Sequence, residues 1–100
     1  MLVELPSVLV LNPKDNVGVV PANVDAGRAL VNGVAAAERI PRGHKVAIRP
    51  IAEGTPVLKY GQIIGYATKD IRPGEHVHLQ NLAIHEVELS MNSASITPRP

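Results

Sequence analysis

Two histidines stand two residues apart in the segment His76-Val77-His78. If this segment is a β-strand, both imidazoles leave the same face, with their Cα atoms about 6.5 Å apart. Two imidazoles at that spacing can bind one divalent metal ion, or can contact an anionic, hydroxylated ligand. A metal site needs three or more ligands, so a solvent-facing polar side of an amphipathic strand is the more common explanation.

A third histidine, His44, is followed directly by Lys45. A lysine at the end of a strand can bind a carboxylate, and a neighbouring histidine can transfer a proton near neutral pH. Exposed lysines are common on strands, so Lys45 also has a simple structural explanation. His44 shares its parity with Val46 and Ile48, so partial burial with an ordinary hydrogen bond is the alternative for this residue.

Lys59-Tyr60-Gly61 combines a cation, a phenol and a flexible backbone. The chain has only two tyrosines and no Phe or Trp, so Tyr60 is more readily explained as core packing than as a ligand contact. Asn81 follows His78 by three residues. It is either a ligand-facing amide or a turn residue that closes the strand through its own side chain, and local grounds favour the turn.

A repeated spacing predicts how these residues are positioned. A β-branched residue, a glycine three positions later and a valine three further recur three times, as Ile40-x-x-Gly43-x-x-Val46, Ile51-x-x-Gly54-x-x-Val57 and Ile71-x-x-Gly74-x-x-Val77. Each unit is typical of a strand end, a tight turn and a strand start. The fold class expected is therefore mostly β, compact, with short strands, Gly/Pro turns and little helix.

The expected strands are short and follow one another closely. They cover residues 2–11 (an edge strand), 17–20, 28–31, 34–37, 44–51, 57–60, 62–68, 76–79 and 82–89. The Asn32-Gly33 pair favours a hairpin over 28–37, with a short helical turn at 35–38 as the alternative. In the strand 76–79, Val77 and Leu79 are expected to point into the core. Gly65 indicates a bulge or a close backbone approach.

Composition bounds the remaining possibilities. One hundred residues fit one small domain, expected over 1–89, with a disordered polar tail over 90–100. The formal net charge of +1 argues against nucleic acid as a partner. The sequence shows no cysteine, no signal peptide pattern and no apolar run long enough to span a membrane. We therefore expect a soluble, cytoplasmic protein without a membrane partner.

The ordered clusters resemble a known family over residues 12–84. They are Asp15-Asn16-Val17, Ile40-Pro-x-Gly-His-Lys-Val-Ala-Ile48, Ile51-Ala-Glu-Gly-x-x-Val57, Lys59-Tyr60-Gly61-x-Ile63-Ile64-Gly65-x-Ala67-Thr68, Ile71-x-Pro-Gly-Glu-His-Val-His78 and Asn81-Leu82. At these spacings they resemble the SAF-type domain of the altronate/galactarate dehydratase family. The match is poorer between Val20 and Ile40, and the region after Leu82 is not diagnostic.

The resemblance implies a β-clip fold and a lyase that acts on a hydroxylated acid. The chain would be the small subunit, or the N-terminal domain, of a dehydratase for a sugar acid, inactive alone and completed by a large catalytic subunit in an oligomer. It also implies a divalent metal, Fe²⁺, bound mainly by that partner. The site residues implied are His44 and His78 as catalytic, Lys45, Lys59, Tyr60 and Asn81 as substrate-binding, and His76 and His78 as metal ligands.

Three other readings stay open. The sulfolactate sulfo-lyase small subunit is a relative within the same resemblance. Glycine-turn β-folds of this type also serve as non-catalytic carbohydrate-binding or assembly modules, which would not require the His-x-His strand or the Lys-Tyr-Gly turn. Exposed β-edges and an apolar N-terminal segment are also compatible with a structural oligomerisation domain.

Overall fold

The computed structural model describes residues 6–85, and within them every regular element is a β-strand. The eight strands are β1 (Val17–Val19), β2 (Ala29–Val31), β3 (Val34–Ala35), β4 (Lys45–Ala47), β5 (Pro56–Lys59), β6 (Gln62–Ala67), β7 (His76–Val77) and β8 (Leu82–Ala83). The expectation of a mostly-β domain with short strands is confirmed. The described residues include no helix of the length and apolarity that a membrane crossing requires.

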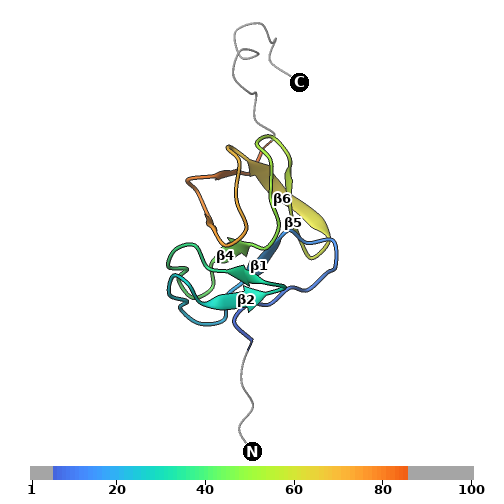
Figure 1. The fold of residues 1–100 in the computed structure, drawn as a ribbon. Helices are drawn as coiled ribbons and strands as arrows, with labels where there is room; N and C mark the ends of the chain where they lie inside the picture. The colour runs from blue at the N-terminus through green and yellow to red at the C-terminus, as the bar shows by residue number, and fades with distance from the viewer. Residues whose placement is uncertain (1–5, 86–100) are drawn as a thin grey trace, which may run out of the picture.

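The strands form three small antiparallel sheets. Their orders are β1-β4-β7, β2-β3 and β5-β6-β8. The sheet that contains β1 and β4 lies between the β2-β3 hairpin at one end of the molecule and the sheet of β5 and β6 at the other (Figure 1). The central sheet is therefore covered on both sides, and β4 runs through the middle of the domain.

Two aliphatic clusters fill the interior, one on each face of β4. Val46 belongs to a cluster with Val8, Val20, Val24, Ala36 and Ile40. Ala47 belongs to a second cluster with Val17, Ile51, Val57, Ala67, Ile71 and Val77. Val46 and Ala47 are both fully buried. Successive side chains of β4 point to opposite faces, and each face packs against its own cluster, so neither face is exposed to solvent. Small aliphatic side chains suit a strand that is enclosed on both sides.

The three glycine turns share one hydrogen-bond pattern. In each, the glycine N–H donates to the carbonyl of a residue outside the turn, and the N–H of that residue donates to the carbonyl that follows the glycine. The pairs are Gly43 with Val20 (2.8 Å), Gly54 with Ala67 (2.8 Å) and Gly74 with Ala47 (2.7 Å). All three glycines have positive φ, at 81°, 83° and 94°. The predicted turns are confirmed, and each one also ties its loop to a distant segment.

The β2-β3 hairpin and the close approach at Gly65 are also confirmed. Asn32 (φ 49°) and Gly33 (φ 79°) connect β2 to β3, and no helical turn follows them. The β5-β6 register shifts between Val57 and Leu58, which marks a bulge. A Cβ atom on Gly65 would lie 2.5 Å from the carbonyl oxygen of Ala83, so only glycine lets β8 approach β6 this closely.

Several expected strands are shorter than the sequence indicated. The N-terminal edge strand was wrong in its described part, which holds one isolated bridge between Leu9 and Val19. β7 ends at Val77, and the placement of Leu79 in the core was wrong, because a turn over 78–81 leaves its side chain 81% exposed. Within the described residues β8 covers two positions of the expected strand 82–89. The expected tail over 90–100 lies outside the described residues.

Alanine at Gly74 should destabilise the fold far more than alanine at Gly27. Both glycines have positive φ, which costs an alanine about 1–2 kcal/mol. A Cβ on Gly27 meets open space, whereas a Cβ on Gly74 would overlap the Ala35 carbonyl oxygen. We expect Gly74→Ala to lower the free energy of unfolding by at least about 2 kcal/mol more than Gly27→Ala in urea denaturation. Equal losses would contradict this packing argument.

Candidate functional site

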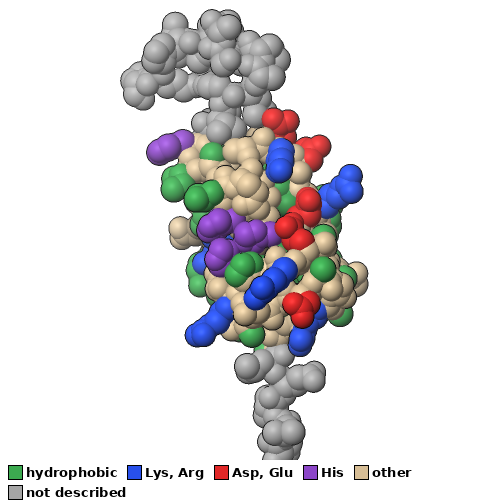
Figure 2. Space-filling view, turned by 90° about the vertical axis from the view of Figure 1, so that its left-hand side faces the viewer, with side chains coloured by type: hydrophobic (Ala, Val, Ile, Leu, Met, Phe, Trp, Pro, Cys, Tyr) green, Lys and Arg blue, Asp and Glu red, His purple; other side chains and the backbone are tan. Residues whose placement is uncertain are grey.

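Three histidines converge on one face of the domain. The Nδ1 atom of His44 lies 2.8 Å from the Nε2 atom of His76, and the centroids of the three rings of His44, His76 and His78 are 4.6–5.4 Å apart. One ligand atom from each ring lies within 4.8 Å of the others. Histidine side chains form a continuous patch on the surface (Figure 2). We call these three residues the histidine cluster.

The pairing of β4 with β7 creates this cluster. Lys45 is opposite Val77 and Val46 is opposite His76, so continuing the antiparallel register by one residue places His44 opposite His78. Directly opposed side chains in an antiparallel pair are close neighbours, and long side chains also reach across the diagonal, as between His44 and His76. The expected pair His76 and His78 is therefore joined by a third imidazole from a distant part of the sequence.

Asn81 holds the backbone beneath two of these histidines. Its side chain is buried, its Oδ1 accepts from the His78 N–H (3.0 Å), and its Nδ2 donates to the His76 carbonyl (2.8 Å). The Asn81 N–H also donates to the His78 carbonyl at 3.1 Å. The prediction that Asn81 closes a turn is confirmed. Its assignment as a substrate-binding residue stays a prediction, and its amide is already bonded to backbone on both sides.

The surroundings of His76 favour its neutral form. Partial burial lowers the pKa of His76 below its usual range, the neighbouring His44 and His78 lower this pKa further, and Lys45 acts in the same direction. Glu38 opposes them. A neutral imidazole has a free ring nitrogen that can accept a proton or bind a metal ion. The hydrogen bond between His44 and His76 requires one ring to donate and the other to accept.

Two lysines border a hollow beside the histidine cluster. The hollow encloses about 290 Å³, and we call it the lysine hollow; its lining consists of Lys45, Lys59, Ile64, His78, Leu79, Leu82 and Ile84. Burial lowers the pKa of Lys45, and the charge of Lys59 lowers it further. The two ammonium groups are thus close enough to repel, and an anion bound between them would relieve that repulsion.

Tyr60 lies at the tip of the β5-β6 hairpin and not in the core. Its side chain is 57% exposed, so the preferred core placement was wrong. Its φ of 58° is typical of a tight turn, in which the side chain is directed away from the strands. Lys59 Nζ lies 5.0 Å from the centroid of the Tyr60 ring, within cation–π range. Tyr60 does not line the lysine hollow, and its contact with substrate stays a prediction.

Asp15 is the residue that sequence reasoning missed. Its buried carboxylate accepts from the N–H groups of Tyr60 (2.9 Å) and Gly61 (2.7 Å). The neighbouring Asn16 accepts from the Leu58 N–H (2.7 Å) on β5, the strand that leads into this turn. These bonds fix the hairpin that carries Lys59 and Tyr60. In the sequence Asp15 entered only through the cluster Asp15-Asn16-Val17 of the family resemblance, because a partner 45 residues away leaves no local pattern.

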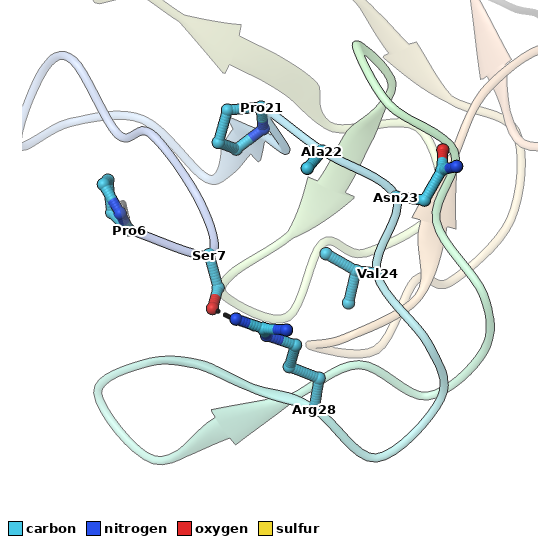
Figure 3. A pocket seen from close by; sticks show the side chains of 7 residues that line it. All are labelled: Pro6, Ser7, Pro21, Ala22, Asn23, Val24 and Arg28. Carbon is cyan, nitrogen blue, oxygen red and sulfur yellow. Dashed lines mark hydrogen bonds between the residues drawn. The ribbon is translucent and has the colours of Figure 1, made fainter. Parts of the chain in front are cut away.

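A second, smaller hollow lies near the N-terminal end of the described chain and encloses about 80 Å³ (Figure 3). Its polar contact is a hydrogen bond of 3.1 Å from the Arg28 Nε to the Ser7 hydroxyl, drawn as a dashed line in the figure. This hollow shares no lining residue with the lysine hollow or with the histidine cluster.

Comparisons with known proteins identify the family of this domain. Residues 6–85 match the family described as the altronate/galactarate dehydratase SAF domain. Altronate dehydratase of Bacillus subtilis is 34% identical over 98 residues, which are 95% of this chain and 19% of that protein. (2R)-Sulfolactate sulfo-lyase subunit alpha of Chromohalobacter salexigens is 44% identical over 78 residues, 68% of this chain and 83% of that subunit. Galactarate dehydratase (L-threo-forming) of Escherichia coli is 35% identical over 65 residues, 63% of this chain and 12% of that enzyme.

Acidification should destabilise the metal-free protein through His76. Its pKa in the folded chain lies below the ordinary value of 6.5, so the unfolded chain binds the proton more readily. The stabilising contribution is present above that value and is lost as the pH falls through the lower pKa of the folded state. With EDTA present, His76→Gln should flatten the dependence of unfolding free energy on pH between about 7.5 and about 5.5. The same slope in His76→Gln as in a His85→Gln control would contradict this.

Removing the Asp15 carboxylate should release the hairpin tip. Asp15→Ala leaves the part-buried N–H groups of Tyr60 and Gly61 without their acceptor, at a cost of about 1–2 kcal/mol each. The free energy of unfolding should fall by about 2–4 kcal/mol, and the amides of Tyr60 and Gly61 should exchange hydrogen faster. Asp25→Ala, at an exposed position, is the matched control and should change stability by less than about 0.5 kcal/mol. Unchanged protection at both amides in Asp15→Ala would refute the contact's importance.

Proposed function

This chain belongs to the altronate/galactarate dehydratase SAF-domain family, and we propose that it is the small subunit, or the N-terminal domain, of a hydro-lyase that dehydrates a sugar acid together with a large catalytic subunit. The observation that carries the proposal is the placement of three histidines beside a hollow bordered by two lysines. The family relation alone would support the fold without identifying which face meets the substrate.

The residues on this face match the demands of the reaction. Dehydration removes a proton from the carbon next to the carboxylate and expels a hydroxyl group, as water, from the following carbon. It needs a base, an acid and positive charge near the carboxylate, where negative charge develops. Lys45 and Lys59 supply that charge at the lysine hollow. His44 and His78 are the proposed proton-transfer residues, because an imidazole can both accept and donate a proton.

A divalent metal, Fe²⁺, is the proposed cofactor. Bound beside the carboxylate, such an ion would stabilise the negative charge that develops on the substrate. His76 and His78 are the residues of this chain proposed to approach it, and the depressed pKa of His76 keeps a ring nitrogen available for binding. In this proposal the large subunit supplies most of the remaining catalytic groups.

Exposed apolar residues at the rim of the lysine hollow favour the binding of a second protein chain. Leu79 is 81% exposed and Ile84 is 76% exposed, and both line the hollow. A sugar acid carries hydroxyl groups and would not bury such apolar surface favourably. A protein partner would, since apolar side chains are stabilised when they leave water. Closure by a partner would also remove water from the lysines and strengthen their attraction for an anion.

A sulfo-lyase subunit is the second candidate function. It is favoured by the match to sulfolactate sulfo-lyase subunit alpha, which extends over 83% of that protein. Two lysines can bind a sulfonate as readily as a carboxylate, so the hollow is compatible with either anion. In both cases the chain would act on an anionic hydroxylated acid with a larger partner.

Turnover should require both components. We expect the chain mixed with the large lyase subunit of its own source to act on one of altronate, galactarate or sulfolactate under anaerobic iron(II), and the chain alone to show none. His78→Ala should lower this activity by about 10²-fold or more, because it removes a proposed proton-transfer group. His85→Ala is the matched control, since His85 lies outside the histidine cluster, and should retain activity.

Two results would overturn this proposal. Turnover at the full rate by the chain alone would refute the need for a large subunit. If no substrate reacted and no complex eluted from a sizing column, the chain would instead be assigned as a non-catalytic binding or assembly module.

A further inference from the structure

We propose that His44, His76 and His78 form a complete metal site of this chain itself, which takes one divalent first-row transition-metal ion without ligands from a partner. The sequence pattern offered only the pair His76 and His78, and the family resemblance implied that the metal is bound mainly by the large subunit. The proposal concerns the same site as the proposed function. The role that we give to the metal ion rests on that function. Metal binding by this chain can be measured without any turnover.

The separations between the ring nitrogens suit one small ion. Metal–nitrogen bonds of about 2.0–2.1 Å in tetrahedral geometry place two ligand nitrogens about 3.3 Å apart. His44 Nδ1 and His76 Nε2 are 2.8 Å apart, and one ligand atom of each of the three histidines lies within 4.8 Å of the others. The hydrogen-bonded pair must therefore open by about 0.5 Å and the third ring must move inward. All three rings are half-buried at the surface, so their side chains have room to rotate toward a common ion.

The backbone under the cluster is fixed before any ion binds. The β4-β7 pairing sets the separation between His44 and the other two histidines. Asn81 binds the carbonyl of His76 and the N–H of His78, so the turn between those residues cannot easily spread. A site assembled in advance loses less conformational entropy on binding than three separate side chains would.

The ligand types identify the class of ion. Three neutral imidazoles favour iron(II), cobalt(II), zinc or copper over magnesium or calcium, which prefer oxygen ligands. Three protein ligands also leave at least one coordination position free, which is typical of catalytic and not of structural sites. His78 lines the lysine hollow as well, so the cluster and the anion-binding lysines adjoin through a shared side chain.

A cobalt(II) titration of the full 100-residue chain, stripped with EDTA, tests the site directly. The visible absorbance of bound cobalt(II) should saturate at one equivalent. His44→Ala, His76→Ala and His78→Ala should each weaken binding at least tenfold, whereas His85→Ala should bind like the wild type. Circular dichroism of every variant checks that the fold is retained. In the zinc-loaded chain, the ring ¹⁵N resonances of the three cluster histidines should shift and those of His85 should not.

Three results would overturn the proposal. The first is the absence of cobalt binding at about 100 µM metal, a concentration above the dissociation constant that a resident ion would need. The second is unchanged binding by a folded His44→Ala variant, and the third is loss of binding in His85→Ala. Cobalt binding through the three histidines without lyase turnover in the two-component assay would support this site and reject the proposed function. Turnover with no cobalt bound by this chain would support the proposed function, reject this metal site and place the metal on the partner.

Discussion

Buried backbone N–H and C=O groups must find partners, and two side chains meet this demand at the loops that carry the candidate site. Asp15 and Asn81 are the buried polar residues in the part of the chain that the structure describes. Asp15 accepts hydrogen bonds from the N–H groups at the tip of the β5-β6 hairpin, and Asn81 forms hydrogen bonds with the backbone of His76 and His78. Strands of two to six residues cannot hold these loops alone, so the positions of Lys59, His76 and His78 depend on buried residues that lie behind them.

The core of residues 6–85 contains no large aromatic residue, and the close packing around the central sheet explains why. β4 separates two aliphatic clusters, so both faces must accept neighbours at close range. Gly18 on β1 shows the constraint, since a Cβ there would lie 2.5 Å from a methyl carbon of Val8. Small and β-branched residues pack well on such a sheet. Because the strands are short, each of the three glycine turns adds a pair of hydrogen bonds between segments that lie apart in the sequence.

Features with local causes could be predicted from the sequence, and features that depend on pairing could not. Gly43 and Asn32-Gly33 reveal their turns because few other residues tolerate positive φ. The approach of His44 to His78 depends on the register between β4 and β7, which no short pattern encodes. Tyr60 was misplaced because composition suggested a core aromatic, whereas the turn geometry at its own position determined its exposure. The contact of Asp15 with the hairpin is equally non-local.

The charge around the site is the strongest argument that it binds something. Burial and like charge lower the pKa of both Lys45 and His76, so the fold disfavours positive charge where it has placed two lysines and three histidines. Glu38 is the acidic neighbour that opposes this at His76, and the lining of the lysine hollow includes no carboxylate. A domain selected for stability alone would separate or neutralise these groups. An anion at the lysines would offset their mutual repulsion, while a metal ion at the histidines would use the neutral imidazole of His76 that its surroundings favour. The two ligands would then attract each other across His78, so each would strengthen the binding of the other.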